Sequence, residues 1–341
     1  KSDGRLTASE ALVVSDTGAY ASLGPLVIIR ACFHATGPYV VPHVKTDAYC
    51  MYTNNTMAGS FRGFGSPQVH FAAECQMDEL AKKLDLDPLD LRMKNILRPG
   101  TLTATSQLVD EACGLEECAV RATEAANWRA KRLEFARDSG TFRRGIGIAL
   151  MYHGNSLGPE GNDYAYVHVL IKPDARVVVR TALTEYGTGA ISGLAQVAAE
   201  TLGLPIDLFE LGRPDTASCQ ETGPTVASRV IVIGGRATQI AAQKLKEKIL
   251  DVGGDLLHCE PSKLTIKDGL VQHLDDARRT ITFQKVVEEC YKRHVSLTET
   301  GYYIAPKCEF DPESSQGTTY HQYTYGAVVA EIQVDTELGV V

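Results

Sequence analysis

Hydrophobic residues recur at helical spacing in several parts of the chain. Ser66 and Pro67 offer an N-cap and a first helical residue, and apolar residues then return every three or four positions up to residue 84. Asp87-Pro88 marks a second helix start of the same kind. The spacing predicts helices over residues 67–84, 88–96, 115–137, 191–202, 228–250 and 283–293.

Short apolar runs bounded by turn residues predict strands elsewhere. Residues 8–33 and 40–52 mix apolar runs with Gly and Ser, so strands joined by loops are expected there. Further strands are expected over residues 147–152, 164–171 and 177–183, the last two joined by a Pro173-Asp174 turn. Helices and strands do not alternate strictly. This order favours an α+β fold of mixed α/β layers over a doubly wound sheet.

A polar stretch over residues 138–144 separates a helix-rich part from a strand-rich part. The chain has 341 residues, of which 44% are apolar, which is enough for two cores of ordinary size. We therefore expect two domains, over residues 1–140 and 141–341.

Composition narrows the classes of partner. A net charge of -8 and scattered Lys and Arg residues argue against nucleic acid binding. The apolar runs are too short for a membrane span. Nine dispersed cysteines without a CxxC pair predict no iron–sulfur cluster or zinc site in this chain. They are expected to be buried, reduced thiols, which indicates a cytoplasmic protein.

Three glycine-punctuated segments are candidates for ligand binding. Residues 59–68 place glycines around Phe64 directly before a predicted helix, where backbone N–H groups can meet an anion. Residues 221–228 join small and hydroxyl residues to another helix start, which would suit a phosphate. Residues 184–189 form a turn between a strand and a helix. Each segment taken alone is also typical of an ordinary tight turn.

Two other motifs are weaker. Residues 154–158 match the G-x-S-x-G string around a serine nucleophile, but Ser156 is followed by a further strand where a hydrolase needs a helix. The pair Gly145 and Gly147 opens a strand, which is the wrong place for a dinucleotide-binding loop. A serine hydrolase and an NAD-binding protein are therefore disfavoured.

Taken together and in order, the three segments resemble the molybdopterin subunit of the xanthine dehydrogenase and aldehyde oxidase family. Residues 30–34 and 323–335 add to the resemblance, which extends over essentially the whole chain. It implies a molybdenum–molybdopterin cofactor and a molybdenum hydroxylase, an oxidoreductase that hydroxylates its substrate with water. On this basis residues 1–140 would end a first molybdopterin-binding domain and residues 141–341 would begin a second.

The resemblance also assigns site residues. Phe64 matches the aromatic residue that packs on the substrate ring, and Arg30 matches an arginine that meets charge developing on a purine substrate. Gly158 stands where a substrate contact is expected. No residue is expected to bind the metal directly. The positions that match cofactor contacts are Arg62, Gly63, Gly65, Thr188, Thr225, Val226, Ala227 and Ser228.

This sequence departs from the family pattern at several of these positions. Thr188 replaces a common Gln beside the metal's oxygen ligand, and Val226 replaces a smaller alanine. Leu157 and Gly158 stand where the purine oxidases place Phe and Thr. The substrate pocket is therefore expected to be wider or rebuilt for another ring.

Some parts of the family's machinery have no match in the chain. The general-base glutamate and the N-terminal cofactor loop are absent, so we expect a split subunit or a fragment of a longer one. A 2Fe-2S centre and FAD are expected on other domains or subunits of a multi-subunit enzyme. Arg30 favours a purine-like or other N-heteroaromatic substrate. The alternatives are an aldehyde oxidoreductase of the same family and a non-catalytic cofactor-binding module.

Overall fold

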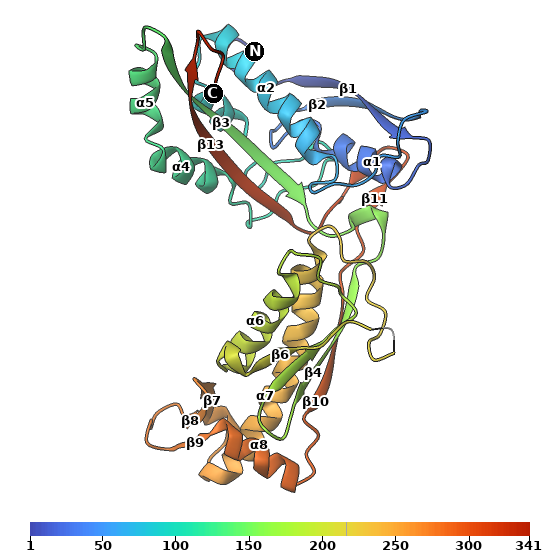
Figure 1. The fold of residues 1–341 in the computed structure, drawn as a ribbon, viewed down its shortest axis with the longest axis vertical. Coiled ribbons are helices and arrows are strands. Elements are labelled where there is room, and N and C mark those ends of the chain that lie inside the picture. The colour runs from blue at the N-terminus through green and yellow to red at the C-terminus, as the bar shows by residue number, and fades with distance from the viewer. Residues whose placement is uncertain (216) are drawn as a thin grey trace. The chain divides into compact units, whose positions relative to one another are not determined.

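The computed structural model describes residues 1–215 and 217–341 and divides the chain into two compact units (Figure 1). Unit 1 comprises Lys1–Gly154 and Cys308–Val341, and unit 2 comprises Asn155–Lys307. The chain leaves unit 1 after one long strand and returns to it at Cys308 for the last three strands. The polar stretch 138–144, where the sequence predicts a domain boundary, lies at the start of that first long strand.

Unit 1 combines a βαβ motif, a group of helices and a long antiparallel ribbon. Strands β1 and β2 are parallel and are joined by α1, while β3 and β13 pair along their whole lengths. The elements are β1 (Ala8–Gly18), α1 (Gly24–His34), β2 (His43–Tyr52), α2 (Ser66–Leu84), α3 (Pro88–Asn95), α4 (Leu115–Ala125), α5 (Trp128–Phe135), β3 (Phe142–Gly154), β11 (Phe310–Asp311), β12 (Gln316–Gly317) and β13 (Tyr323–Asp335).

The core of unit 1 contains a buried ion pair among its apolar residues. Arg92 on α3 donates from Nε to Glu74 on α2 at 2.8 Å, and the hydroxyl of Tyr39 donates to the same carboxylate. The amide of Leu150 on β3 donates to Glu74 at 3.0 Å. Because all these groups are buried and paired, the ion pair joins α2, α3 and β3 without leaving a charge unsatisfied.

Unit 2 places helices against a four-stranded sheet with the order β10-β4-β5-β6. Strand β4 lies where the sequence predicts a strand, and its buried residues alternate with partly exposed ones. Helices α6 and α7 lie against each other. The elements are β4 (Tyr164–Ile171), β5 (Val177–Arg180), α6 (Ala190–Leu202), β6 (Phe209–Leu211), α7 (Gly235–Leu257), β7 (Leu264–Lys267), β8 (Leu270–His273), β9 (Thr280–Thr282), α8 (Phe283–Lys292) and β10 (Thr298–Ile304).

A glycine on β10 lets α7 pack closely on the sheet. A Cβ atom at Gly301 would lie 1.8 Å from the carbonyl oxygen of Ala237 in the first turns of α7. Only glycine fits there, so Gly301 brings the N-terminal part of α7 onto the sheet. The start of α7 is thereby fixed next to the loops described below.

The mixed α+β fold class is confirmed, and most predicted helices and strands are present. The prediction is wrong over Gly24–His34, which forms α1 and not strands and loops. Residues 115–137 form two helices, because Asn127 adopts a left-handed conformation with φ 53° and breaks the helix. Ser66 is not the N-cap of α2: Gly65 is, and the Ser66 hydroxyl hydrogen-bonds the ring of His153.

The predicted helix 228–250 differs at both ends. It opens with a π-helical turn, Val230–Gly234, and continues as α7 to Leu257. Ala227 and Ser228 have φ values of 53° and 58°, so they cannot belong to a right-handed helix. The helix therefore begins only after a left-handed turn.

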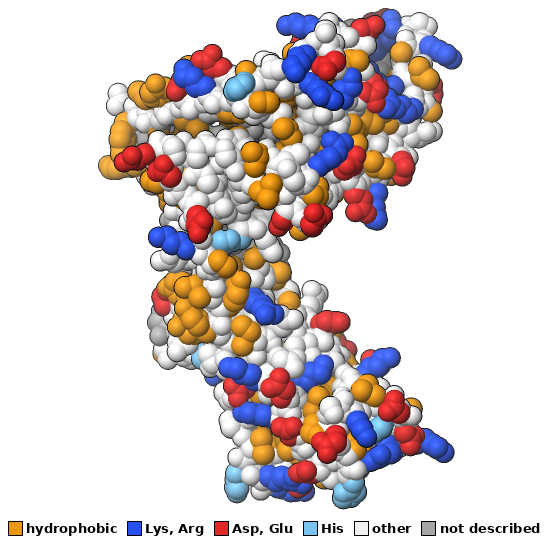
Figure 2. All heavy atoms as spheres, turned by 180° about the vertical axis from the view of Figure 1, so that it is seen from behind, with side chains coloured by type: hydrophobic (Ala, Val, Ile, Leu, Met, Phe, Trp, Pro, Cys, Tyr) orange, Lys and Arg blue, Asp and Glu red, His pale blue; other side chains and the backbone are white. Residues whose placement is uncertain are grey.

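Three surface properties relate to the expectations from composition: the apolarity of the helices, the distribution of charge and the burial of the cysteines. None of the helices within the described residues combines the length and apolarity that crossing a lipid bilayer requires. On the face shown in Figure 2, Lys and Arg side chains are interspersed with Asp and Glu side chains. Free cysteines occur throughout the described chain, and Cys290 is buried whereas Cys75 is exposed. The expectation of general cysteine burial is therefore wrong.

Candidate functional site

The loop before α2 has an unusual backbone. Gly63, Phe64 and Gly65 all have positive φ, at 91°, 50° and 94°. A Cβ atom at Gly65 would lie 2.4 Å from the carbonyl oxygen of Val27 on α1, so the loop approaches that helix too closely for any side chain. A bulky residue such as Phe64 in this conformation is strained, and such strain is concentrated at functional sites. Arg62, next to it, is exposed.

Arg30 lies directly behind this loop in unit 1. Its side chain is 1% exposed, and its Nη1 donates to the carbonyl of Gly154 at 3.1 Å. The guanidinium carbon lies 5.5 Å from the Phe64 ring centroid and 4.8 Å from that of Tyr320. The structure thus brings the two predicted substrate residues, Arg30 and Phe64, together. The cation lies within cation–π distance of both aromatic rings.

Three histidines surround the end of β3 near Arg30. His34 hydrogen-bonds the carbonyl of Arg30 through Nδ1 at 2.8 Å, and its Nε2 accepts from the amide of Gly154 at 3.1 Å. This pairing requires a neutral ring with its proton on Nδ1. Burial lowers the pKa of His34 well below its usual value. Burial also lowers the pKa of His70 and of His153 to about 4, so all three rings are neutral at pH 7.

In unit 2, the amides of the turn before α6 donate hydrogen bonds to a carboxylate of the same turn, that of Glu185. Glu185 accepts hydrogen bonds from the amides of Gly187, Gly189 and Ile191, and from both the amide and hydroxyl of Thr188. Partial desolvation raises the pKa of Glu185, but the backbone donors together outweigh it and lower the pKa to about 2. The amides of this turn therefore already hold an internal anion.

The turn before α7 keeps its donors open. Ala227 and Ser228 are consecutive left-handed residues, and within the described residues their amides donate to no protein acceptor. The Thr222 hydroxyl oxygen is buried and likewise has no hydrogen-bond partner in the described part of the chain. Backbone N–H groups without a protein acceptor in a strained turn are donors that suit the oxygens of an anionic cofactor.

Hydrogen bonds join the predicted loops of unit 2 to one another. The Thr225 hydroxyl accepts from the amide of Thr184 at 2.8 Å, and the Tyr186 hydroxyl donates to the Thr225 carbonyl at 3.0 Å. The amide of Ser156 donates to the Ala227 carbonyl at 2.7 Å. Ser156 is followed by a short 3₁₀ turn, Gly158–Glu160, and then by β4, so no nucleophile-elbow helix is formed.

A charged pair that the sequence did not predict contacts these loops. Asp163 and Arg229 form a buried ion pair in unit 2, with Arg229 Nε 2.9 Å from Asp163 Oδ1. The two residues lie far apart in the sequence, and an isolated Asp or Arg is usually on the surface. The sequence offered only a local signal for this pair. Asp163 immediately precedes a predicted strand, and Arg229 immediately follows the glycine-punctuated segment 221–228.

The predicted site residues therefore form one group in each unit. Unit 1 holds Arg30, Arg62, Gly63, Phe64 and Gly65, and unit 2 holds Gly158, Thr188, Thr225, Val226, Ala227 and Ser228. Within the residues that the structure describes, no three His, Cys, Asp or Glu side chains are arranged to hold a metal ion. That both groups bind one cofactor stays a prediction.

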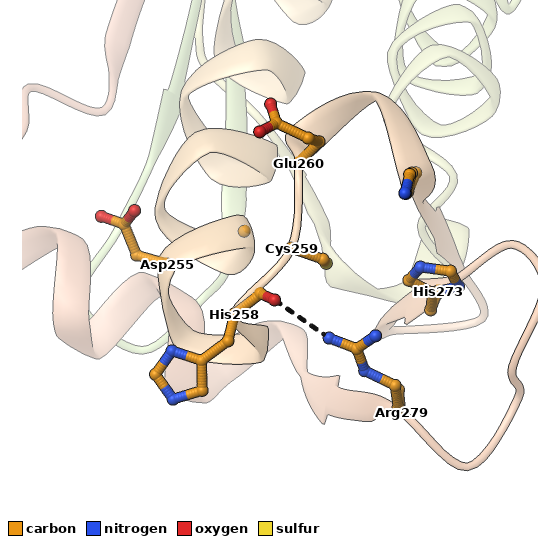
Figure 3. Close-up of a pocket in the computed structure, with 8 residues that line it drawn as sticks. Asp255, His258, Cys259, Glu260, His273 and Arg279 are labelled. Carbon is orange, nitrogen blue, oxygen red and sulfur yellow. Dashed lines mark hydrogen bonds between the residues drawn. The ribbon is translucent and has the colours of Figure 1, made fainter.

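An open cavity of about 540 Å³ lies elsewhere in unit 2, at the C-terminal end of α7 (Figure 3). Its lining is polar, and the Arg279 guanidinium donates to the carbonyls of Leu257 and His258. Arg279 thus satisfies the last carbonyls of α7. None of the predicted site residues lines this cavity, so we do not assign it to the candidate site. Its lining residues are Gly254, Asp255, His258, Cys259, Glu260, Lys263, His273 and Arg279.

Comparison with protein families gives two matches that together span most of the chain. Residues 119–341, about two thirds of the chain, match a model described as a molybdopterin cofactor-binding domain. Residues 1–96 match a second model with the same description.

Individual relatives agree with these matches. A xanthine dehydrogenase molybdenum-binding subunit of Escherichia coli is 28% identical over 98% of this chain and 44% of its own length. The aldehyde oxidoreductase of Megalodesulfovibrio gigas is 29% identical over 99% of this chain and 34% of its own length. The nicotinate dehydrogenase large molybdopterin subunit of Eubacterium barkeri is 51% identical, over 36% of this chain and 29% of its own length.

Solved structures share the fold. Quinoline 2-oxidoreductase from Pseudomonas putida 86 superposes with a TM-score of 0.82 at 23% identity, over 99% of this chain and 44% of that one. Aldehyde oxidoreductase from Desulfovibrio gigas superposes with a TM-score of 0.80 at 28% identity, over 98% of this chain and 34% of that one. The chain spans less than half the length of these relatives.

Proposed function

The chain belongs to the molybdopterin-binding subunits of the xanthine dehydrogenase and aldehyde oxidase family, and on that premise we propose that it works as part of a molybdenum hydroxylase. The observation that carries the proposal is the turn before α7, where the amides of Ala227 and Ser228 are open in a strained backbone. Thr225 ties this turn to the Thr188 segment. The cofactor-binding roles of Arg62, Gly63, Gly65, Thr188 and Thr225–Ser228 are part of the proposal.

The chain's own residues would bind and orient the reactants. When bound, the molybdenum–molybdopterin cofactor would supply oxidative hydroxylation of a substrate carbon with water as the oxygen source. The strained turn sets the backbone from which the Phe64 ring projects, and a flat substrate can pack against that ring. The guanidinium carbon of Arg30 lies 5.5 Å from the centroid of that ring, and this cation can stabilise negative charge that develops on the substrate.

We propose an N-heteroaromatic substrate, such as a purine-like ring. Two things support this choice: the cation next to Phe64, and the 51% identity to part of a nicotinate dehydrogenase subunit. Glycine at 158 and leucine at 157 leave more room than the Phe and Thr expected in purine oxidases, which favours a ring of different shape. A neutral aldehyde is the second candidate, supported by the 29% identity to an aldehyde oxidoreductase over 99% of the chain.

Partners are part of the same proposal. The sheet of β1 and β2 is covered by α1 on one face, while Leu12, Val14, Tyr49 and Met51 are exposed. Parallel sheets are normally buried on both faces, so this surface supports packing against the remaining part of the molybdopterin subunit. A 2Fe-2S centre and a flavin on other domains or subunits would carry electrons away. The free thiols fit a reducing cytoplasm.

The cofactor proposal is tested by analysis of the assembled enzyme that contains this chain. We expect about one molybdenum atom and one releasable pterin for each copy of the chain, measured by elemental analysis and by fluorescence of the oxidised pterin. A fully assembled enzyme with neither would contradict the proposal and would leave a scaffold module as the function.

The substrate proposal is tested through Arg30. In the assembled enzyme, Arg30→Ala should lower kcat/KM for oxo-substituted N-heterocycles by at least about 100-fold, as expected when a donor to developing charge is lost. It should lower kcat/KM for neutral aldehydes far less. Arg30 also holds the Gly154 carbonyl, so any structural loss affects both substrates and cancels in their ratio. Equal losses would exclude the charge-stabilising role.

A further inference from the structure

Arg229 and Asp163 lie where residues 155–158, which we call the Gly158 loop, meet the Thr225–Ser228 turn. Their side chains are 0% and 5% exposed, and Arg229 Nε is 2.9 Å from Asp163 Oδ1. Two charges removed from water cost more free energy than their attraction returns, unless further hydrogen bonds satisfy them. The other partners of the pair therefore indicate its role.

Those partners are backbone atoms of separate segments. Nη1 of Arg229 donates to the carbonyls of Thr222 at 2.7 Å and Pro224 at 3.0 Å, and Nη2 donates to the carbonyl of Tyr164 at 2.5 Å. The second carboxylate oxygen of Asp163 accepts from the amide of Leu157 at 2.9 Å. A planar guanidinium with its donors in a fixed fork can hold these carbonyls at defined angles, which a lysine cannot do.

The pair also sets the space around Gly223. A Cβ atom at Gly223 would lie 3.2 Å from Nη1 of Arg229, and the residue has a φ of 70°. The guanidinium therefore occupies the space next to Gly223, while the amides of Ala227 and Ser228 donate to no acceptor among the described residues. The Ser156 amide, which donates to the Ala227 carbonyl, joins the same assembly from the other loop.

We propose that the Asp163–Arg229 pair is a positioning element that fixes the Gly158 loop and the Thr225–Ser228 turn in their ligand-binding conformation. Its link to the molybdopterin cofactor rests on the proposed function, whereas its effect on the two loops does not. Neither residue contacts the ligand in this proposal. Both act through the backbone that they hold.

Hydrogen–deuterium exchange of the assembled enzyme tests the proposal, with Arg229→Gln as the variant and Arg236→Gln as the matched control. Arg236 is exposed on α7, where it hydrogen-bonds only Gln239 among the described residues. In Arg229→Gln we expect the hydrogen-bonded amides of the two segments to exchange at least about tenfold faster, with α6 and α8 unchanged. These are the amides of Ser156, Leu157, Gly223 and Val226. Unchanged loops, or faster exchange throughout unit 2, would overturn the proposal.

A second variant covers the case in which Arg229→Gln does not fold. Arg229→Lys keeps a cation next to Asp163 but cannot span the three carbonyls. We expect faster exchange at the amides of Gly223 and Val226, and retained protection at the amide of Leu157, which Asp163 still accepts. Wild-type exchange at Gly223 and Val226 in Arg229→Lys would overturn the proposal.

Cofactor content separates this proposal from the proposed function. If the pair acts on the cofactor loops, Arg229→Gln should lose most of its molybdenum and pterin while α6 and α8 keep wild-type exchange. Full cofactor content despite loosened loops would overturn the link to the cofactor. A wild-type enzyme without molybdenum and pterin would instead refute the proposed function, and the exchange comparison would still test the pair.

Discussion

Phe64 shows at the residue scale how backbone conformation can orient a ligand-binding side chain. Glycines on both sides take positive φ at no steric cost, but Phe64 itself has a φ of 50° in a region that bulky residues avoid. The close approach of Gly65 to α1 maintains this conformation, because the loop cannot relax without moving away from the helix. The backbone at Phe64 is therefore ordered before any ligand arrives, which reduces the entropy lost on binding.

Phe64→Ala in the assembled enzyme should weaken binding of flat substrates without removing the cofactor. An aromatic pair contributes roughly 0.5–1.5 kcal/mol beyond its buried area, so KM should rise by about threefold to tenfold or more. Steady-state kinetics with an N-heteroaromatic substrate would measure the change.

The matched control for this prediction is Phe61→Ala, in the same loop. Phe61 is 86% exposed, so its removal should leave KM unchanged. An equal rise in KM for both variants would show that the loop, and not the Phe64 ring, contributes to substrate binding.

The histidine cluster shows at the element scale how α1, α2 and β3 are held together. The ring of His34 on α1 hydrogen-bonds the Arg30 carbonyl and the Gly154 amide. The ring of His153 on β3 hydrogen-bonds the Ser66 hydroxyl at the start of α2. Each ring works as a neutral group, and protonation of His34 would remove the acceptor that binds the Gly154 amide. Packing of these elements therefore depends on pH.

We expect the free energy of unfolding to fall as pH is lowered from about 6.5 to about 4. Burial lowers the pKa of His70 and His153 to about 4 in the folded state, whereas the unfolded chain titrates near 6.5. The unfolded state thus binds protons first, and roughly 3 kcal/mol for each ring is lost across this window. Above pH 6.5 this contribution is fully present.

Urea unfolding between pH 4 and pH 7 would measure this dependence. The double variant His70→Gln, His153→Gln should show a flatter pH profile over the same range. A wild-type profile as flat as that of the double variant would mean that the two rings are already protonated or well solvated in the folded protein.

The elements that the sequence failed to predict have physical explanations. Helix α1 contains consecutive β-branched residues Val27–Ile29 and lacks a side-chain N-cap, so its local signals favour strands. Packing of its buried face on β1 and β2 overrides them. Amphipathic α6 and the capped α3 follow their patterns closely. Spacing alone could not detect Asn127 in a left-handed conformation.

The candidate site was partly predictable for a related reason. Glycine-punctuated turns carry a local signal, so Gly63, Gly65 and the Thr225–Ser228 turn could be located from the sequence. The Asp163–Arg229 pair depends on contacts between residues distant in the sequence, and neither residue type is unusual by itself. Its detection required the fold.

The organisation of the whole molecule depends on two separate cores. One core cluster contains buried residues only from Ala165 to Leu297, all within unit 2. The other draws on Tyr39 to Tyr152, with residues of β13 packed against it, and so lies in unit 1. Unit 2 is one continuous segment, whereas unit 1 needs both ends of the chain to complete the β3–β13 ribbon. Composition could suggest two cores, but it could not show that the segment of unit 2 is inserted within the sequence of unit 1.

This arrangement predicts that residues 155–307 fold when expressed alone. The segment contains all strands of its sheet and the helices α6, α7 and α8, so no buried apolar face depends on unit 1 for its core. We expect helical and strand signals in circular dichroism and one cooperative urea transition. Leu245→Asp, which places a charge at a fully buried position of α7, should abolish the transition. If the unsubstituted segment shows no cooperative transition, unit 2 needs unit 1 to fold and the two cores are not independent.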